Sequence, residues 1–123
     1  MTYRYTPEVL DALAAIAPVT AVRGNVDSGP LAKRLPASAI LTVGGVTIYV
    51  LHILDDLDLE PRTAGVQVVV SGHTHEPLVR ARREVLYVNP GSAGPRRFSL
   101  PVTVGLLHVE AGVPRAEIVE LQL

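Results

Sequence analysis

Two histidines one residue apart give the clearest chemical signal in the sequence. The segment Gly72-His73-Thr74-His75 follows residues 66–70, an almost continuous apolar run typical of a strand covered on both faces. In an extended segment, side chains two residues apart point to the same side, so both imidazoles can face one site. Neutral imidazole is a common ligand of first-row divalent metals, and Gly72 would allow a tight turn at the strand end. The pair predicts a metal site, with two exposed loop histidines as an equally weighted alternative.

Other polar side chains stand where further strands are expected to end. His52 follows the apolar residues 46–51, and Asn25 lies shortly after residues 19–22. Binding sites in open α/β sheets gather at the carboxyl ends of the strands. One amide oxygen beside two or three imidazoles is a ligand set suited to Mn²⁺, Fe²⁺ or Zn²⁺. Taken singly, Asn25 would more often be a turn residue and His52 a polar strand terminus, and His108 is interpreted as a half-exposed strand residue.

The elements that must position these side chains form one strand-rich α/β domain. Thr6-Pro7-Glu8 predicts the start of a helix, which ends before Pro18. Gly44-Gly45 predicts a hairpin turn, a second turn is expected at Gly112-Val113-Pro114, and residues 53–63 predict a short helix or a loop. Strands are expected at residues 19–22, 39–43, 46–51, 66–70, 78–81, 85–88, 102–109 and 116–121.

Composition limits the class of protein. With 123 residues, 48% of them hydrophobic and 19% charged, the chain has the size and apolar content of one folded domain and not of a disordered segment. A net charge of −1 argues against a dedicated nucleic-acid or membrane surface, and the absence of cysteine excludes disulfides and thiolate metal sites. The sequence shows no signal segment and no apolar run long enough to span a bilayer. We therefore expect a cytoplasmic protein with no membrane partner.

Four segments in a fixed order resemble the calcineurin-like metallophosphoesterases. They are Val22-Arg23-Gly24-Asn25-Val26-Asp27, the strand that ends in His52, Ser71-Gly72-His73-Thr74-His75-Glu76-Pro77, and Asn89-Pro90-Gly91-Ser92. The likeness is strongest to the small bacterial and archaeal phosphodiesterase branch, and it covers the chain from the first helix onward. It implies an α/β fold class in which a β-sandwich of two sheets is flanked by helices and carries a two-metal site at its strand ends.

The resemblance also implies roles for individual residues. Asn25, His52 and His73 match the ligands of one divalent metal (Mn²⁺, Zn²⁺, Fe²⁺ or Ni²⁺), and His75 matches a ligand of a second. The same three histidines are the implied catalytic residues, acting on a small phosphodiester. Two metals would hold its phosphate and activate a hydroxide, and the histidines would stabilise charge on the phosphate oxygens. Ser92 and Arg96 are the implied substrate contacts, although Arg96 would more often be an ordinary surface arginine.

The chain also departs from the family pattern. No Asp-x-His and no Gly-Asp sequence occurs in it, so we expect a domain, residues 1–123, without the family's first two strands and the helix between them. The carboxylate that bridges the two metals is then missing, so we expect at most one bound metal and hydrolysis barely above background.

A smaller departure is Ile53, which replaces the usual glycine after the strand-end histidine and would resist a positive φ. The nearby Asp55, Asp56 and Asp58 could supply a substitute carboxylate, with a solvated helix face as the simpler interpretation.

Two alternatives and an assembly state remain open. The chain could be a catalytically inactive protein-binding scaffold, as is the retromer subunit that shares this fold, or a one-metal binding module. Residues 19–22 and 66–70 would have open edges without the family's first strands, and such edges favour pairing with another chain. The mean hydropathy of +0.31 also favours burial in an interface. We therefore expect a homo-oligomer, in the simplest case a two-fold dimer.

Overall fold

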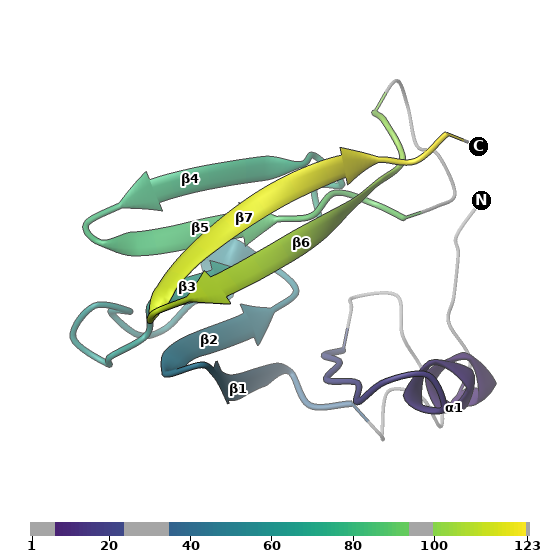
Figure 1. Cartoon of the computed structure of the whole chain (residues 1–123), viewed down its shortest axis with the longest axis horizontal. Coiled ribbons are helices and arrows are strands. Elements are labelled where there is room, and N and C mark those ends of the chain that lie inside the picture. Colours follow the sequence, from purple (N-terminus) through teal and green to yellow (C-terminus); the bar gives the residue numbers. More distant parts are fainter. Residues whose placement is uncertain (1–6, 24–34, 94–99, 123) are drawn as a thin grey trace.

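A computed structural model describes residues 7–23, 35–93 and 100–122 of the chain. The elements are one α-helix, one short 3₁₀ helix and seven strands in these residues (Figure 1). They are α1 (Pro7–Ala14), β1 (Ser38–Val43), β2 (Val46–Leu51), η1 (Leu54–Asp56), β3 (Val68–Val70), β4 (Leu78–Arg82), β5 (Val85–Asn89), β6 (Thr103–Glu110) and β7 (Val113–Glu120). The predicted helix and the α/β fold class are confirmed, and the predicted strands are confirmed with the exception of residues 19–22.

Five strands form a mixed sheet in the order β1-β2-β3-β5-β4. The β1–β2 and β4–β5 pairs are antiparallel hairpins, whereas β2, β3 and β5 run parallel to one another. Because parallel strands end at the same edge of a sheet, the segments that follow β2, β3 and β5 are brought to one place. This parallel core is what gathers the chemistry-bearing residues.

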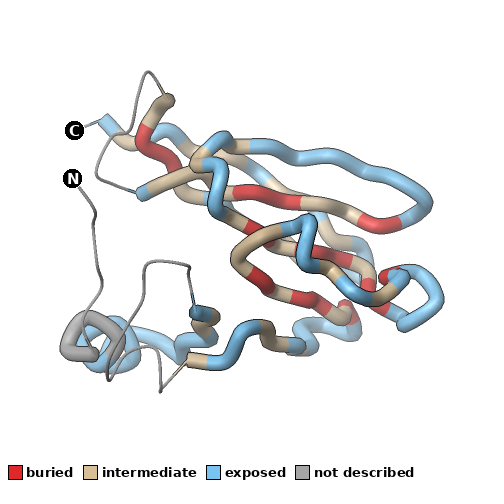
Figure 2. Tube along the Cα trace, turned by 180° about the vertical axis from the view of Figure 1, so that it is seen from behind, coloured by how far each residue is buried: buried red, intermediate tan, exposed pale blue. Residues whose placement is uncertain are grey.

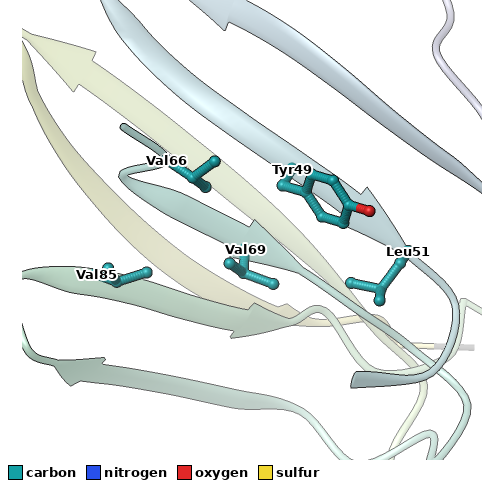
Figure 3. Close-up of a cluster of buried hydrophobic side chains, with 5 residues drawn as sticks. All are labelled: Tyr49, Leu51, Val66, Val69 and Val85. Atoms are coloured by element: carbon teal, nitrogen blue, oxygen red, sulfur yellow. The ribbon is translucent and has the colours of Figure 1, made fainter. Parts of the chain in front are cut away.

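The β6–β7 hairpin forms a second sheet that lies across one face of the first (Figure 1). Side chains of β2 are buried on both faces of the large sheet. Val46 and Ile48 belong to a buried cluster against which Leu107 and Val109 of β6 pack. Tyr49 and Leu51 belong to a cluster on the other face (Figure 3), against which Leu57 and Leu59 of the segment after β2 pack. The predicted two-sheet sandwich is therefore present.

Buried residues are concentrated in the central strands, whereas the α1 region and the hairpin tips are exposed (Figure 2). Leu13 and Ile16, which the helical spacing places on an apolar face, are both exposed, and Ile16 is 84% accessible. Neither helix of the described residues has the length and the apolar content needed to cross a membrane.

The hairpin turns explain the strand boundaries. Gly44 and Gly45 have φ values of 54° and 81°, and a positive φ at both positions is what a two-residue type I′ turn needs. The β6–β7 turn lies at Ala111 and Gly112, which also have positive φ, and not at residues 112–114 as expected. Pro114 instead lies within β7, opposite Val109.

The expectation that residues 66–70 form an open sheet edge is wrong. β3 pairs with β2 on one side and with β5 on the other, and its Val68 and Val69 are completely buried. Residues 19–22 form no strand, so they supply no sheet edge either. Among the described strands, β1 and β4 lie at the two edges of the large sheet, because each pairs with one neighbour.

Candidate functional site

Three parallel strands end side by side at the candidate site. His52 follows β2, Ser71 and Gly72 follow β3, and Asn89 is the last residue of β5. The backbone N–H of Gly72 donates to the carbonyl of His52 at 2.9 Å, and the N–H of Ser71 donates to the carbonyl of Val88 at 3.0 Å. These bonds continue the sheet beyond its regular strands, so they fix the His52 segment against the start of the histidine loop, residues 72–77.

His52 and His73 are in contact. Their ring centroids lie 5.2 Å apart with the planes at 80°, an edge-to-face arrangement. His73 is exposed, whereas Nε2 of His52 and Nδ1 of His75 are shielded from solvent. The structure thus brings two imidazoles from different strand ends together at the sheet edge, with His75 two residues further along the loop.

The histidine loop is not extended, which corrects the geometric argument drawn from the sequence. His73 and His75 have φ values of 74° and 63°, and the N–H of Thr74 donates to the carbonyl of Gly72 at 2.9 Å. A bond between residues i and i+2 around a positive φ defines a tight γ-turn, which is rare and strained. The backbone reverses at the histidines themselves, and Gly72 has no positive φ.

Asn89 holds this strained loop in place. Its Nδ2 donates to the carbonyl of Gly72 and to Oγ1 of Thr74, both at 3.1 Å, and its Oδ1 accepts from the N–H of Gly91 at 3.0 Å. The residue is only 8% exposed. The sequence predicted a turn at residues 89–92 but no positioning role for Asn89. An asparagine directly between an apolar strand and Pro-Gly is the signal that could have indicated it.

The turn after Asn89 connects the site to the second sheet. Thr103 at the start of β6 donates from Oγ1 to the carbonyl of Pro90 at 2.7 Å, and its N–H donates to the carbonyl of Ser92 at 2.9 Å. Gly91 lies between these contacts with a φ of 79°. Ser92 is therefore held against the start of β6, whereas Asn25 and Arg96 lie outside the described residues.

The backbone after His52 has dihedral angles that a β-branched residue readily adopts. Ile53 has a φ of −112°, so the β-branched side chain meets no conformational conflict at this position. Asp56 and Asp58 line a pocket of about 340 Å³ together with His52, whereas Asp55 does not. All three aspartates are exposed, as the interpretation of a solvated face predicts, and two of them also border a recess beside the site.

The donor set fits a divalent metal in part. His52 and His73 bring two imidazole rings into contact, and imidazole nitrogen is a ligand that Mn²⁺, Fe²⁺ and Zn²⁺ accept. In residues 7–23, 35–93 and 100–122, however, no three His, Cys, Asp or Glu side chains come close enough together to hold a metal. The described residues alone therefore form no complete metal site, and the two imidazoles in contact would need further ligands from other residues or from water.

Replacing Asn89 with alanine is expected to lower the free energy of unfolding by about 2 kcal/mol, because three hydrogen bonds of a buried amide are lost. Urea denaturation measures this change. Asn89→Asp is the matched control, since it keeps an acceptor for Gly91 but loses both donor bonds to the loop. Backbone NMR shifts of His73 and His75 should move in both variants; unchanged shifts would contradict the positioning role.

Known proteins resemble this chain along most of its length. Residues 4–112 match the calcineurin-like phosphoesterase superfamily domain. A protein of Methanocaldococcus jannaschii described as a "probable metallophosphoesterase" is 39% identical over 93 residues, which are 69% of this chain and 46% of that protein. The chain therefore spans about half the length of this relative.

Solved structures share the fold. An archaeal phosphodiesterase superposes with a TM-score of 0.71 at 20% identity, covering 93% of this chain and 77% of its own. Vps29 of Chaetomium thermophilum also gives a TM-score of 0.71, at 21% identity, covering 94% and 75%. The order of strand-end motifs, the two-sheet fold and the domain match together lead to one conclusion: the chain belongs to the calcineurin-like phosphoesterase superfamily.

Proposed function

We propose that this polypeptide acts in the cytoplasm as part of a metal-dependent phosphodiesterase for small phosphodiesters, and that its own activity is strongly reduced. The observation that carries the proposal is the contact between His52 and His73 at the carboxyl ends of parallel strands. A site at this edge of a parallel sheet is where α/β proteins bind their ligands. The archaeal phosphodiesterase with the same fold supports the choice of substrate class.

Within this proposal, His52 and His73 hold one divalent metal together with Asn25, and His75 offers a ligand to a second. Such an ion neutralises phosphate charge and activates water for in-line attack. The exposed His73 can donate a hydrogen bond to a phosphate oxygen, and Ser92 offers a hydroxyl at the same edge. Asn89 contributes by holding the His73 loop in one conformation before substrate arrives. Arg96 is the proposed further contact to the phosphate.

Metal titration tests the proposal. We expect at most one Mn²⁺ or Zn²⁺ per chain, and His73→Ala should weaken the metal affinity more than about tenfold. Loss of a residue that only supports a ligand typically costs about 10–100-fold in affinity, and loss of the ligand itself should cost at least the lower value. His108→Ala is the control, since that histidine lies on β6 beside Glu117 and away from the strand-end site. A stoichiometry near two, or equal effects of the two variants, would contradict the proposed site.

A protein-binding scaffold or a one-metal module is the second candidate. Its support is the set of exposed apolar residues on open edges and on the α1 region, combined with the lack of a three-ligand group in the described residues. Ile40 on the edge strand β1 is 62% exposed. Exposed apolar side chains on an edge strand can be covered by a partner. A chain that binds partners but shows no metal-dependent hydrolysis would favour this candidate.

Self-association is a separate prediction. Because β1 and β4 have unpaired edges and carry exposed Ile40 and Leu78, pairing with a second copy would bury both backbone and apolar groups. We expect a homodimer with a mass about twice the 13.1 kDa of one chain. Size exclusion coupled to light scattering at micromolar concentration measures it, and a clean mass near 13.1 kDa would rule the dimer out.

A further inference from the structure

β4 is the most exposed strand of the large sheet. All five of its residues, Leu78–Arg82, are exposed, whereas each of the other four strands contains residues that are at least half-buried. It lies at one end of the strand order and pairs with β5 alone among the described strands. Figure 1 shows it as the border of the sheet farthest from β1. An exposed edge strand is a template for pairing with an extended segment of another chain.

The hydrogen bonds of β5 show which backbone groups of β4 point to this edge. The N–H of Leu86 and the carbonyl of Val88 bond to residues that flank β3, at 2.9 Å and 3.0 Å. Leu86 and Val88 thus direct these groups away from β4. Backbone bonding alternates along an antiparallel pair, so their partners in β4, Ala81 and Val79, are positions without bonds to β5. The N–H and C=O groups of Val79 and Ala81 therefore point to the edge of the sheet.

The side chains of β4 give this edge a positive charge. Arg80 and Arg82 lie on one face of the strand, because their partners in β5 belong to, or pack against, the buried cluster of Figure 3. The β4–β5 hairpin, residues 78–89, carries three arginines and one acidic residue. That acidic residue, Glu84, pairs with Arg62 at 3.7 Å. Arg80 and Arg82 thus present two cations, two residues apart, on the face away from the second sheet.

We propose that β4 binds an extended acidic segment of a partner protein, which adds to the sheet as an antiparallel strand. Its main chain bonds to the edge-directed groups of Val79 and Ala81. Its carboxylates stand at two alternate positions opposite Arg80 and Arg82. These are non-hydrogen-bonded positions of the new pair, where opposite side chains lie closest together, so the charges interact at short range. The proposal is independent of the phosphoester site.

A second copy of the chain matches β4 less well. Antiparallel pairing of β4 with itself, centred on Arg80 or Ala81, would place arginines opposite arginines, and like charges directly opposite destabilise a sheet. β1 suits self-association better, because its residues Ser38–Val43 include no charged side chain. Single-stranded nucleic acid would neutralise the guanidinium groups with its phosphates but would supply no strand to the backbone edge. An acidic extended peptide matches both the charges and the backbone.

Two hexapeptides of identical composition test the proposal. Acetyl-Val-Glu-Val-Glu-Val-Thr-amide presents both carboxylates on one face of a strand, whereas acetyl-Glu-Glu-Val-Val-Val-Thr-amide presents them on opposite faces. NMR titration of the full chain should show that the first peptide binds about fivefold more tightly, because it gains one opposite-charge pair. The amides of Val79 and Ala81 should exchange more slowly with solvent in the complex than in the free chain. N-methylation of the central valine should abolish binding, since it removes a main-chain donor without a change of charge.

Charge reversal shows whether the arginines contact the peptide directly. Arg80→Glu should weaken binding of the first peptide at least about fivefold. Arg115→Glu is the matched control, because it makes the same change at an exposed residue of β7, in the other sheet, and should leave the affinity unchanged. A chain with both Arg80→Glu and Arg82→Glu should instead bind the peptide in which lysine replaces both glutamates.

Several outcomes would overturn the proposal. Equal binding of the two peptides, binding of neither at millimolar concentration, or equal effects of Arg80→Glu and Arg115→Glu would show that the arginines only protect the edge strand from pairing. Tighter binding of single-stranded oligothymidylate than of either peptide would assign the arginines to nucleic acid. Slow exchange of the Val79 and Ala81 amides in the chain alone would show that the edge is already occupied.

Discussion

The 123-residue polypeptide is expected to hydrolyse bis(4-nitrophenyl) phosphate with Mn²⁺ at a rate barely above that of the metal alone, about 10²–10³-fold below a phosphodiesterase that holds two metals. The reason lies in the ligands. The sequence contains no Asp-x-His, and the described residues include no group of three His, Cys, Asp or Glu side chains that could hold a metal. Loss of one preorganised electrostatic group usually costs a factor of about this size.

The residual rate should depend on the strand-end histidines. His73→Ala is expected to reduce hydrolysis to the rate of the metal alone, whereas His108→Ala should leave it unchanged, because His108 lies on β6. Parallel assays of the two variants and of the M. jannaschii relative measure the hydrolysis rates, and circular dichroism confirms folding. Turnover comparable to that of the relative, abolished by His73→Ala, would contradict the expected impairment. A residual rate equal in both variants would instead exclude His73 from the reaction.

Gly91→Ala is expected to lower the free energy of unfolding by about 3 kcal/mol, from backbone strain plus overpacking. Gly91 has a φ of 79°, which L side chains rarely adopt, and a Cβ there would overlap Oγ1 of Thr103. That hydroxyl donates to the carbonyl of Pro90 at 2.7 Å, and Thr103 is only 2% exposed, so it has little room to move. Denaturant unfolding measures the change.

Gly65→Ala separates the two causes. Gly65 has the same φ of 79°, but nothing lies within 4 Å of the position that a Cβ would take. Its replacement should therefore cost only the backbone term, about 1 kcal/mol. The difference between the two variants measures the contact with Thr103. Equal destabilisation would contradict the steric argument, and it would mean that the connection between the site turn and β6 is more adaptable than the structure indicates.

The hairpins and the buried strand followed from local chemistry. Gly44-Gly45 predicted the β1–β2 turn because only a positive φ at both positions closes a two-residue hairpin. The continuous apolar run at residues 66–70 predicted a strand covered on both faces, and β3 is such a strand. Neighbouring residues decide both features, so a sequence pattern is sufficient to recognise them.

Features that depend on distant partners were predicted less well. β3 was expected at an open edge, but β2 and β5 enclose it, and pairing between strands far apart in sequence has no local signal. Residues 19–22 have the composition of a strand but none of the described strands pairs with them. Strand formation needs a partner, so composition alone does not establish it.

The sequence by itself determined where the strands end that lead into the candidate site residues. His52, His73 and the turn at residues 89–92 were all placed at strand ends before any packing was known. Only the tertiary structure decided how they meet. The histidine loop reverses at His73 and His75, and the buried Asn89 holds it there from a different strand. The physical reason is that positive φ values at two non-glycine residues are unfavourable locally, so they persist only where hydrogen bonds from elsewhere in the fold stabilise them.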